Sequence, residues 1–85
     1  MFTKVFQVGV YSRDKIIYEG KAVSLIVPSK LGYLGVLADH APIVAKLVSG
    51  KITIRSLEGD TAVIDLPEEG FLEVFQNQAT ILLAQ

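Results

Sequence analysis

The sequence predicts an all-β fold, a flattened antiparallel β-sandwich of two sheets. Three observations predict it. Apolar residues recur with a period of two, turn-forming residues interrupt the chain at short intervals, and no window of a dozen residues offers a capped helical stripe. Successive side chains of a strand point to opposite faces, so a period of two is typical of half-buried strands. Short strands with frequent turns favour a sandwich or barrel. The length suits one domain, residues 1–85.

The strands follow from alternation and from the turns between them. A turn at residues 13–15 separates the first two strands, and a Glu58-Gly59-Asp60 turn joins a hairpin. Between Pro67 and Gly70 a tight turn is expected, since proline fixes φ and glycine adopts conformations that other residues avoid. A last turn at residues 76–78 closes the final hairpin. The later strands are predicted at residues 22–27, 52–57, 61–66, 71–75 and 79–83.

One segment, residues 28–47, departs from this rhythm. Gly32 and Gly35 flank the apolar pair Tyr33-Leu34, which we expect in a loop. Apolar side chains in a loop are unfavourable in water unless something covers them. The pair therefore either contacts a partner or packs onto its own loop, and this segment is the first candidate for function.

Composition narrows the classes of partner. The net charge of −1 argues against nucleic acid as a main partner. Residues 1–55 hold all eight Lys and Arg against three acids (+5), and residues 56–85 hold six acids and no base (−6). Either strands from the two halves pair and interleave these charges, or the molecule presents one basic and one acidic face; we expect interleaving, because sandwich strands mix in space. The hydrophobic fraction of 51% indicates strands buried on both faces or apolar surface kept for a partner.

Several features predict a soluble intracellular domain. There is no cysteine, and hence no disulfide or thiolate metal site. The longest apolar stretches are far shorter than the roughly 20 residues that span a bilayer. The N-terminus lacks the layout of a signal peptide.

The residues give little support to an enzyme. Gly50-Lys51 lacks the other positions of a phosphate loop. A single histidine, His40, cannot supply the three or four ligands of a His/Cys metal site. Its ring is expected either to hydrogen-bond the backbone of its own turn or to contact a partner. Glu68 and Glu69 point apart on extended chain and indicate a solvated turn. We therefore predict no catalytic, metal or cofactor-binding residue.

Phe71 and Phe75 share one face of their predicted strand. Core packing or an apolar interface explains them better than a ligand platform does, because few basic residues lie near them in the sequence.

The run Gly32-Tyr33-Leu34-Gly35-Val36-Leu37-Ala38-Asp39-His40-Ala41-Pro42 resembles the signature of F-type ATP synthase epsilon subunits. Further matches keep register with it, at Tyr18-Glu19-Gly20 and Gly70-Phe71-Leu72-Glu73-Val74. The resemblance covers essentially the whole chain.

This resemblance implies the N-terminal β-sandwich domain of an epsilon subunit. Such a subunit is a non-catalytic part of the central stalk, or rotor; it binds the gamma subunit and the c ring and couples translocation of protons or sodium ions to ATP synthesis. The implied location is peripheral, on the cytoplasmic face of the bacterial inner membrane in preference to the chloroplast thylakoid or the mitochondrial inner membrane. No cofactor, small-molecule substrate or nucleic acid is implied. The alternative is a generic β-sandwich module that binds a protein or a small ligand.

By position, the resemblance assigns Ser12 and His40 to the gamma contact. It assigns Ser29, Lys30, Leu31, Gly32, Tyr33 and Leu34 to the c-ring contact. The chain departs from the family at Tyr33, where an acidic residue is common, and at Ala38-Asp39, where Pro-Gly is common. Family members often continue into two C-terminal helices, and we expect no C-terminal helical domain in these 85 residues.

Overall fold

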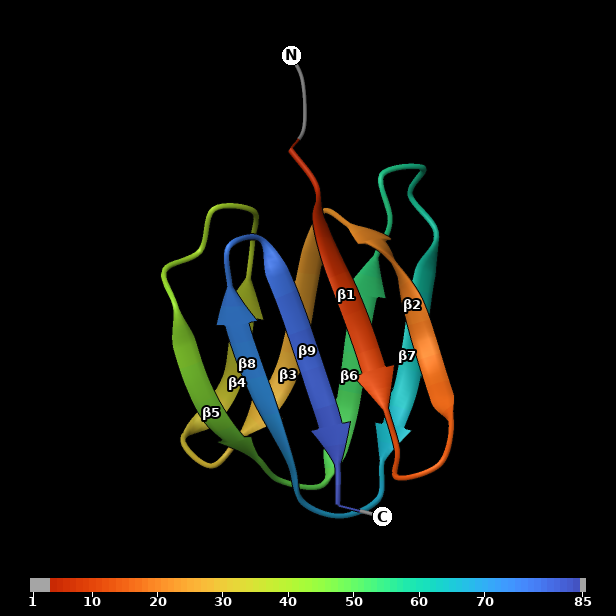
Figure 1. Ribbon diagram of the computed structural model, residues 1–85, viewed down its shortest axis with the longest axis vertical. Coiled ribbons are helices and arrows are strands. Elements are labelled where there is room, and N and C mark those ends of the chain that lie inside the picture. The colour runs from red at the N-terminus through yellow and green to blue at the C-terminus, as the bar shows by residue number, and fades with distance from the viewer. Residues whose placement is uncertain (1–3, 85) are drawn as a thin grey trace.

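The computed structural model describes residues 4–84 and is built of β-strands joined by turns (Figure 1). None of these residues is helical, so the all-β prediction is confirmed. The strands are β1 (Phe6–Tyr11), β2 (Ile16–Ala22), β3 (Ser24–Ser29), β4 (Gly32–Val36), β5 (Ile43–Leu47), β6 (Gly50–Arg55), β7 (Thr61–Leu66), β8 (Gly70–Phe75) and β9 (Gln78–Leu83).

The strands form one curled sheet that folds into the two layers of a sandwich. Its order is β2-β1-β9-β8-β5-β3-β6-β7, with β4 paired to β3. The link between β5 and β3 is a single residue pair, Ser29 with Leu47. At this narrow link the sheet turns over, so that β2, β1, β9, β8 and β5 form one layer and β4, β3, β6 and β7 the other (Figure 1). Every pairing is antiparallel except that of β1 with β9, which is parallel.

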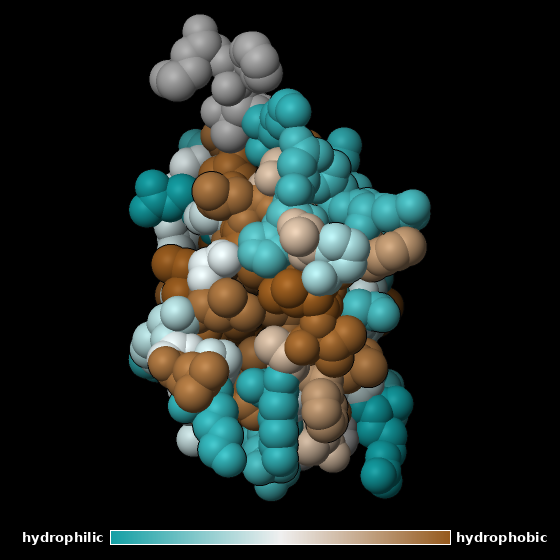
Figure 2. Space-filling view, turned by 90° about the vertical axis from the view of Figure 1, so that its left-hand side faces the viewer, coloured by the Kyte–Doolittle hydropathy of each residue, from teal (hydrophilic) through white to brown (hydrophobic). Residues whose placement is uncertain are grey.

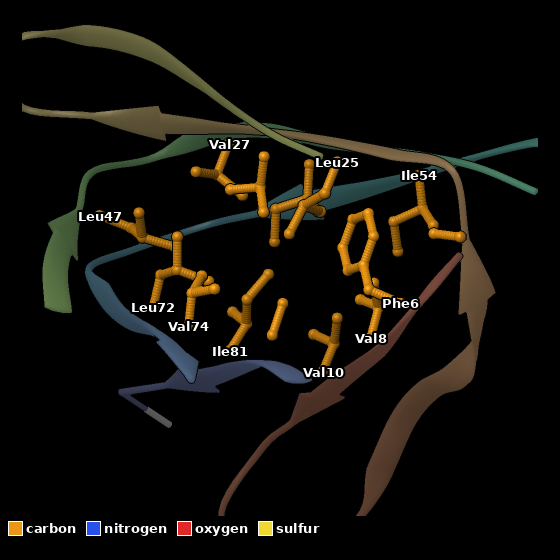
Figure 3. Close-up of a cluster of buried hydrophobic side chains, with 14 of the residues drawn as sticks. Phe6, Val8, Val10, Leu25, Val27, Leu47, Ile54, Leu72, Val74 and Ile81 are labelled. Atoms are coloured by element: carbon orange, nitrogen blue, oxygen red, sulfur yellow. The ribbon is translucent and has the colours of Figure 1, made fainter. Parts of the chain in front are cut away.

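The core lies between the two layers. Figure 3 shows Leu25 and Val27 of β3 pointing toward Leu72, Val74 and Ile81 of the opposite layer. These side chains are fully or almost fully buried, and no polar side chain of the described residues is buried with them. Alternate residues of β8 and β9 point away from the core, as a period of two requires.

The expectation that Tyr33-Leu34 lies in a loop is wrong, because the pair belongs to strand β4. This strand pairs with β3 continuously, from Val36 opposite Leu25 to Gly32 opposite Ser29. Glycine is uncommon in strands, and the two glycines hid the alternation that places Leu34 and Val36 toward the core. The hairpins predicted later in the chain are confirmed, with boundaries shifted by one or two residues.

The two oppositely charged parts of the sequence interleave, as expected. Lys46 lies 3.5 Å from Glu69, and Lys51 lies 2.7 Å from Asp65. Each pair joins a base from residues 1–55 to an acid from residues 56–85. All four side chains are exposed, so these pairs stabilise the fold only slightly.

Candidate interaction surfaces

The β3–β4 hairpin carries all six residues that the sequence assigns to the c-ring contact. Ser29 and Gly32 are the last paired residues, and the Ser29 hydroxyl donates a hydrogen bond to the Gly32 carbonyl oxygen. Gly32 has φ of 123°, a conformation that favours glycine and permits the tight reversal. The reversal leaves Lys30 and Leu31 at the tip, and the Leu31 side chain is fully exposed.

Tyr33 and Leu34 do not act as a pair. Tyr33 is 66% exposed and lies on the outer face of β4. Leu34 points to the other face, is half-buried and packs against the core. Tyr33 thus fits the partner-contact alternative, whereas Leu34 fits packing within the domain. The hairpin therefore leaves Lys30, Leu31 and Tyr33 exposed, and Leu34 packs it against the sandwich.

A groove of about 400 Å³ lies beside this hairpin, on the open side of the sandwich between β4 and β5. Apolar side chains gather over the middle of this side of the molecule, as Figure 2 shows. Lys30 and Lys46 are the charged residues of the lining. The lining comprises Ser29, Lys30, Leu31, Leu34, Ile43, Val44, Ala45 and Lys46.

Ser12 follows the last residue of β1 and opens the turn to β2. Its backbone N–H donates to the Lys15 carbonyl oxygen at 3.0 Å, and its hydroxyl lies 3.4 Å from the same oxygen. These bonds close the turn that the sequence predicts at residues 13–15. The Ser12 side chain is half-buried at the edge of this turn.

His40 lies in the connection between β4 and β5. Its Nδ1 is 2.7 Å from the Ala41 carbonyl oxygen. A carbonyl oxygen only accepts, so Nδ1 carries the proton and Nε2 is left as the acceptor of the neutral ring. The expected hydrogen bond to the backbone of its own turn is confirmed. Among the described residues nothing bonds to Nε2, which leaves this atom available to a partner.

Asp39, the residue before His40, connects three segments that are far apart in the sequence. Lys4 Nζ donates to Asp39 Oδ2 at 2.9 Å, and Asn77 Nδ2 donates to Asp39 Oδ1 at 3.0 Å. In return, the Asp39 backbone N–H donates to Asn77 Oδ1 at 2.6 Å. The Lys4 ammonium first, and the Asn77 amide second, hold the pKa of the Asp39 carboxyl below its ordinary value. The same contact raises the pKa of Lys4.

Sequence reasoning missed the roles of Lys4 and Asn77. For Asn77 the available signal was its residue type, since Asp and Asn tolerate positive φ and bond readily to nearby backbone. Nothing in the sequence showed that the two turns meet in space.

The structure does not bring Ser12 and His40 together. Ser12 follows β1, whereas Lys4, which contacts the neighbour of His40, precedes it. Six strand residues span about 20 Å, so the two positions lie toward opposite ends of the molecule. Ser12 instead shares an end with the tip of the β3–β4 hairpin (Figure 1).

An exposed apolar row crosses the outer face of the layer that contains β8, β9 and β1. Phe71 of β8 lies opposite Leu82 of β9, and Leu82 lies opposite Tyr11 of β1. Phe71 and Leu82 are about half exposed, at 51% and 52%. Phe71 and Phe75 therefore do not belong to the core, and the interface alternative remains for them. Alternation in the sequence places Leu82 on the same face as Gln78 and Thr80, but it does not show that Phe71 and Tyr11 lie beside it.

The Tyr11 side chain lies along this face. Its ring lies over Gly9, where an added Cβ would overlap the Tyr11 hydroxyl. The hydroxyl donates to Glu19 at 2.8 Å, and this bond raises the pKa of Tyr11. Glycine at position 9 is what allows the ring to lie along the sheet.

Within residues 4–84, no group of three or more His, Cys, Asp and Glu side chains is placed to hold a metal ion. The described part of the chain also contains no helix of the length and hydrophobicity needed to cross a membrane.

Comparisons with known proteins give consistent results. The family model described as "ATP synthase, Delta/Epsilon chain, beta-sandwich domain" matches residues 5–85. The ATP synthase epsilon chain of Leptospira borgpetersenii is 42% identical over 82 residues, which cover 96% of this chain and 63% of the relative. The chloroplastic epsilon chain of Emiliania huxleyi is 39% identical over 75 residues, or 88% of this chain and 56% of the relative. This chain thus spans about three-fifths of the length of these relatives.

Solved structures share the fold. A chain of the Euglena gracilis mitochondrial ATP synthase, in a structure of its OSCP, F1 and c-ring, superposes with a TM-score of 0.87 at 19% identity. The match covers 95% of this chain and 51% of that chain. A chain from the central stalk and c-ring structure of the Tetrahymena thermophila enzyme superposes with a TM-score of 0.77 at 13% identity, covering 100% of this chain and 67% of that chain. At such identities the likeness shows the fold alone. The family model and the identity to epsilon chains carry the assignment: this chain belongs to the family of ATP synthase delta/epsilon β-sandwich domains.

Proposed function

We propose that this chain is the β-sandwich part of a non-catalytic rotor subunit of F-type ATP synthase. In this role it binds the gamma subunit and the c ring, and so helps to couple ion translocation to ATP synthesis. It works at the membrane surface through the complex, on the cytoplasmic face of the bacterial inner membrane. The observation that carries the proposal is its membership of the family, with 42% identity to an ATP synthase epsilon chain.

The hairpin tip supports a c-ring contact. Lys30, Leu31 and Tyr33 are exposed at one end of the sandwich, and Leu31 has no cover within the described residues. A leucine and a tyrosine held out by a tight turn supply the apolar anchors that interfaces favour. Chains of the same fold occur in solved ATP synthase assemblies that include the c-ring.

The outer face of β1, β9 and β8 supports a gamma contact. Ser12 and His40 lie toward opposite ends of this layer, so a partner that touches both runs along the molecule. The apolar row of Phe71, Leu82 and Tyr11 crosses the layer at the Ser12 end of this path. A partner on this path would cover the half-exposed Phe71 and Leu82, which otherwise face water.

The proposal is tested by measuring binding to gamma and to a gamma–c-ring subcomplex. Tyr33→Asp is expected to weaken binding to the subcomplex but not to gamma alone. His40→Ala is expected to weaken binding to gamma by roughly 1–2 kcal/mol, the range for a lost buried hydrogen bond. Titration calorimetry on parent and variants measures both.

Val63→Asp is the matched control. Val63 is exposed to a similar degree, 55%, but lies on the outer face of β7, away from both proposed contacts. It should bind both partners as the parent does. Unchanged binding of Tyr33→Asp to the subcomplex would refute the c-ring contact, and superimposable gamma titrations of His40→Ala and parent would refute the His40 contact.

A further inference from the structure

The connection that carries His40 is held by a clasp of three side chains, those of Lys4, Asp39 and Asn77. Lys4 precedes β1, Asp39 lies between β4 and β5, and Asn77 lies in the β8–β9 turn. Three hydrogen bonds of 2.6 to 3.0 Å converge on Asp39, two on its carboxylate and one from its backbone N–H. Its two carboxylate oxygens thus bind two different segments of the chain.

The backbone within the clasp adopts conformations that few residues tolerate. Asp39 has φ of 63° and Asn77 has φ of 59°. Asp and Asn enter this left-handed region more readily than other residues, because their short polar side chains bond locally. Here the Asp39 side chain accepts a hydrogen bond from the Asn77 side chain, and Asn77 Oδ1 accepts one from the Asp39 backbone N–H. These bonds stabilise both left-handed conformations.

Asn77 also anchors the clasp to the sheet. Its carbonyl oxygen accepts a hydrogen bond from the Gln7 backbone N–H at 3.0 Å. Residues 76 and 77 both have positive φ, as the tight two-residue turns of hairpins require. The Asn77 side chain is therefore held by a rigid hairpin, and Asp39 is held by Asn77.

Asp39 directly precedes His40, so whatever fixes Asp39 fixes the backbone that carries the imidazole. The Nδ1–H bond to the Ala41 carbonyl oxygen depends on the shape of the same turn. A turn free to change shape would lose this bond, and the ring would no longer present Nε2 in one direction.

We propose that Lys4, Asp39 and Asn77 are positioning residues that hold His40 ready for its partner. The inference rests on the proposed contact of His40 with gamma. A loop ordered before binding loses less conformational entropy when it binds, so the clasp strengthens binding without touching the partner. All three side chains are exposed, so the clasp changes local order far more than global stability.

Two variants open the clasp while keeping the backbone unstrained. Asp39→Gly and Asn77→Gly both put glycine where φ is positive and remove only the side chain. Lys51→Gln is the matched control, because it breaks an exposed Lys–Asp pair of 2.7 Å that is remote from His40.

The first readout needs no partner. In NMR spectra of the chain, Asn77→Gly should speed hydrogen exchange at the Asp39 amide by about tenfold or more, since that N–H loses its acceptor. In both clasp variants the ¹⁵N shifts of the His40 ring should move toward a mixture of tautomers. The melting temperature should change little. Ring shifts identical to those of the parent would overturn the clasp as a positioning device.

The second readout is the dissociation rate from gamma, which we expect to rise about 3- to 10-fold in the clasp variants and not in Lys51→Gln. In a His40→Ala background, Asp39→Gly should have no further effect. An equal additional effect in that background would show that Asp39 acts without His40 and would overturn the inference. Parent-like binding by His40→Ala would instead overturn the gamma contact itself, a failure that the partner-free readout separates from failure of the clasp.

Discussion

Tyr33 and Leu34 are neighbours in β4, yet their side chains lie in different surroundings. Tyr33 faces solvent, and Leu34 packs against the core. A substitution that is harmless at one position therefore damages the fold at the other, and binding experiments at this hairpin must use position 33.

We expect Leu34→Asp to destabilise the chain by about 2 kcal/mol or more, because it removes apolar contacts and brings a carboxylate to the core surface. Tyr33→Asp should change the free energy of unfolding by no more than about 0.5 kcal/mol. Urea denaturation of both variants measures the difference. Equal stabilities would contradict the packing of Leu34.

The stability of the fold is expected to depend on pH through the Asp39 carboxyl. The Lys4 contact lowers the pKa of Asp39 below its ordinary value of 3.8. A lowered folded-state pKa means that the carboxylate stabilises the fold above the ordinary pKa. That stabilisation is lost as the pH falls through the lowered value. Carboxyl ¹³C titration should show the Asp39 pKa rising in Lys4→Gln, and by less in Asn77→Gly. An Asp39 pKa that is the same in Lys4→Gln and the parent would contradict the ion pair.

At the scale of the strands, two glycines differ in the space that surrounds them. A Cβ at Gly70 would lie 2.7 Å from the Leu82 carbonyl oxygen, a backbone atom that cannot turn away. A Cβ at Gly35 would meet nothing within 4 Å.

We therefore expect Gly70→Ala to cost about 1–3 kcal/mol, as overpacking does. Gly35→Ala, its matched control, should stay within about 0.5 kcal/mol of the parent. Thermal and urea denaturation provide both values. A Gly70→Ala variant as stable as Gly35→Ala would refute the close approach of β8 to β9.

The strands with regular alternation could be predicted from the sequence, and β4 could not. Pairs such as Ile52 and Ile54 reveal their inward face directly, and Glu58-Gly59-Asp60 marks the turn between their hairpin strands. In β4 the outward positions are Tyr33, which is aromatic, and Gly35, which has no side chain, so no polar residue marks the outer face. The strand predicted at residues 22–27 begins two residues too early. Ala22 is the last residue of β2, and Val23 lies at the bend between β2 and β3.

At the scale of the whole molecule, the arrangement depends on contacts between distant parts of the sequence. The parallel pairing of β1 with β9 joins the beginning of the described chain to its end. The sheet turns over at the single Ser29–Leu47 pair. Neither feature has a local signal, because each is decided by how the buried faces fit together once the hairpins exist.

The same limit applies to the candidate surfaces. The sequence pointed to residues 28–47 through their departure from alternation, and the resemblance assigned the contacts of Ser29–Leu34, Ser12 and His40. Alternation placed Phe71 and Phe75 on one face of their strand. It could not show that Ser12 and His40 lie toward opposite ends, nor that Lys4 and Asn77 meet at Asp39. These depend on the curl of the sheet, which brings three segments of the chain to one end.

The central claim is that this chain binds gamma as part of the rotor. A pull-down with the chain as bait and purified gamma from the same source as prey tests it most directly. We expect stoichiometric capture that His40→Ala weakens and Val63→Asp leaves unchanged. Absence of capture by a chain shown to be folded would rule out binding to gamma.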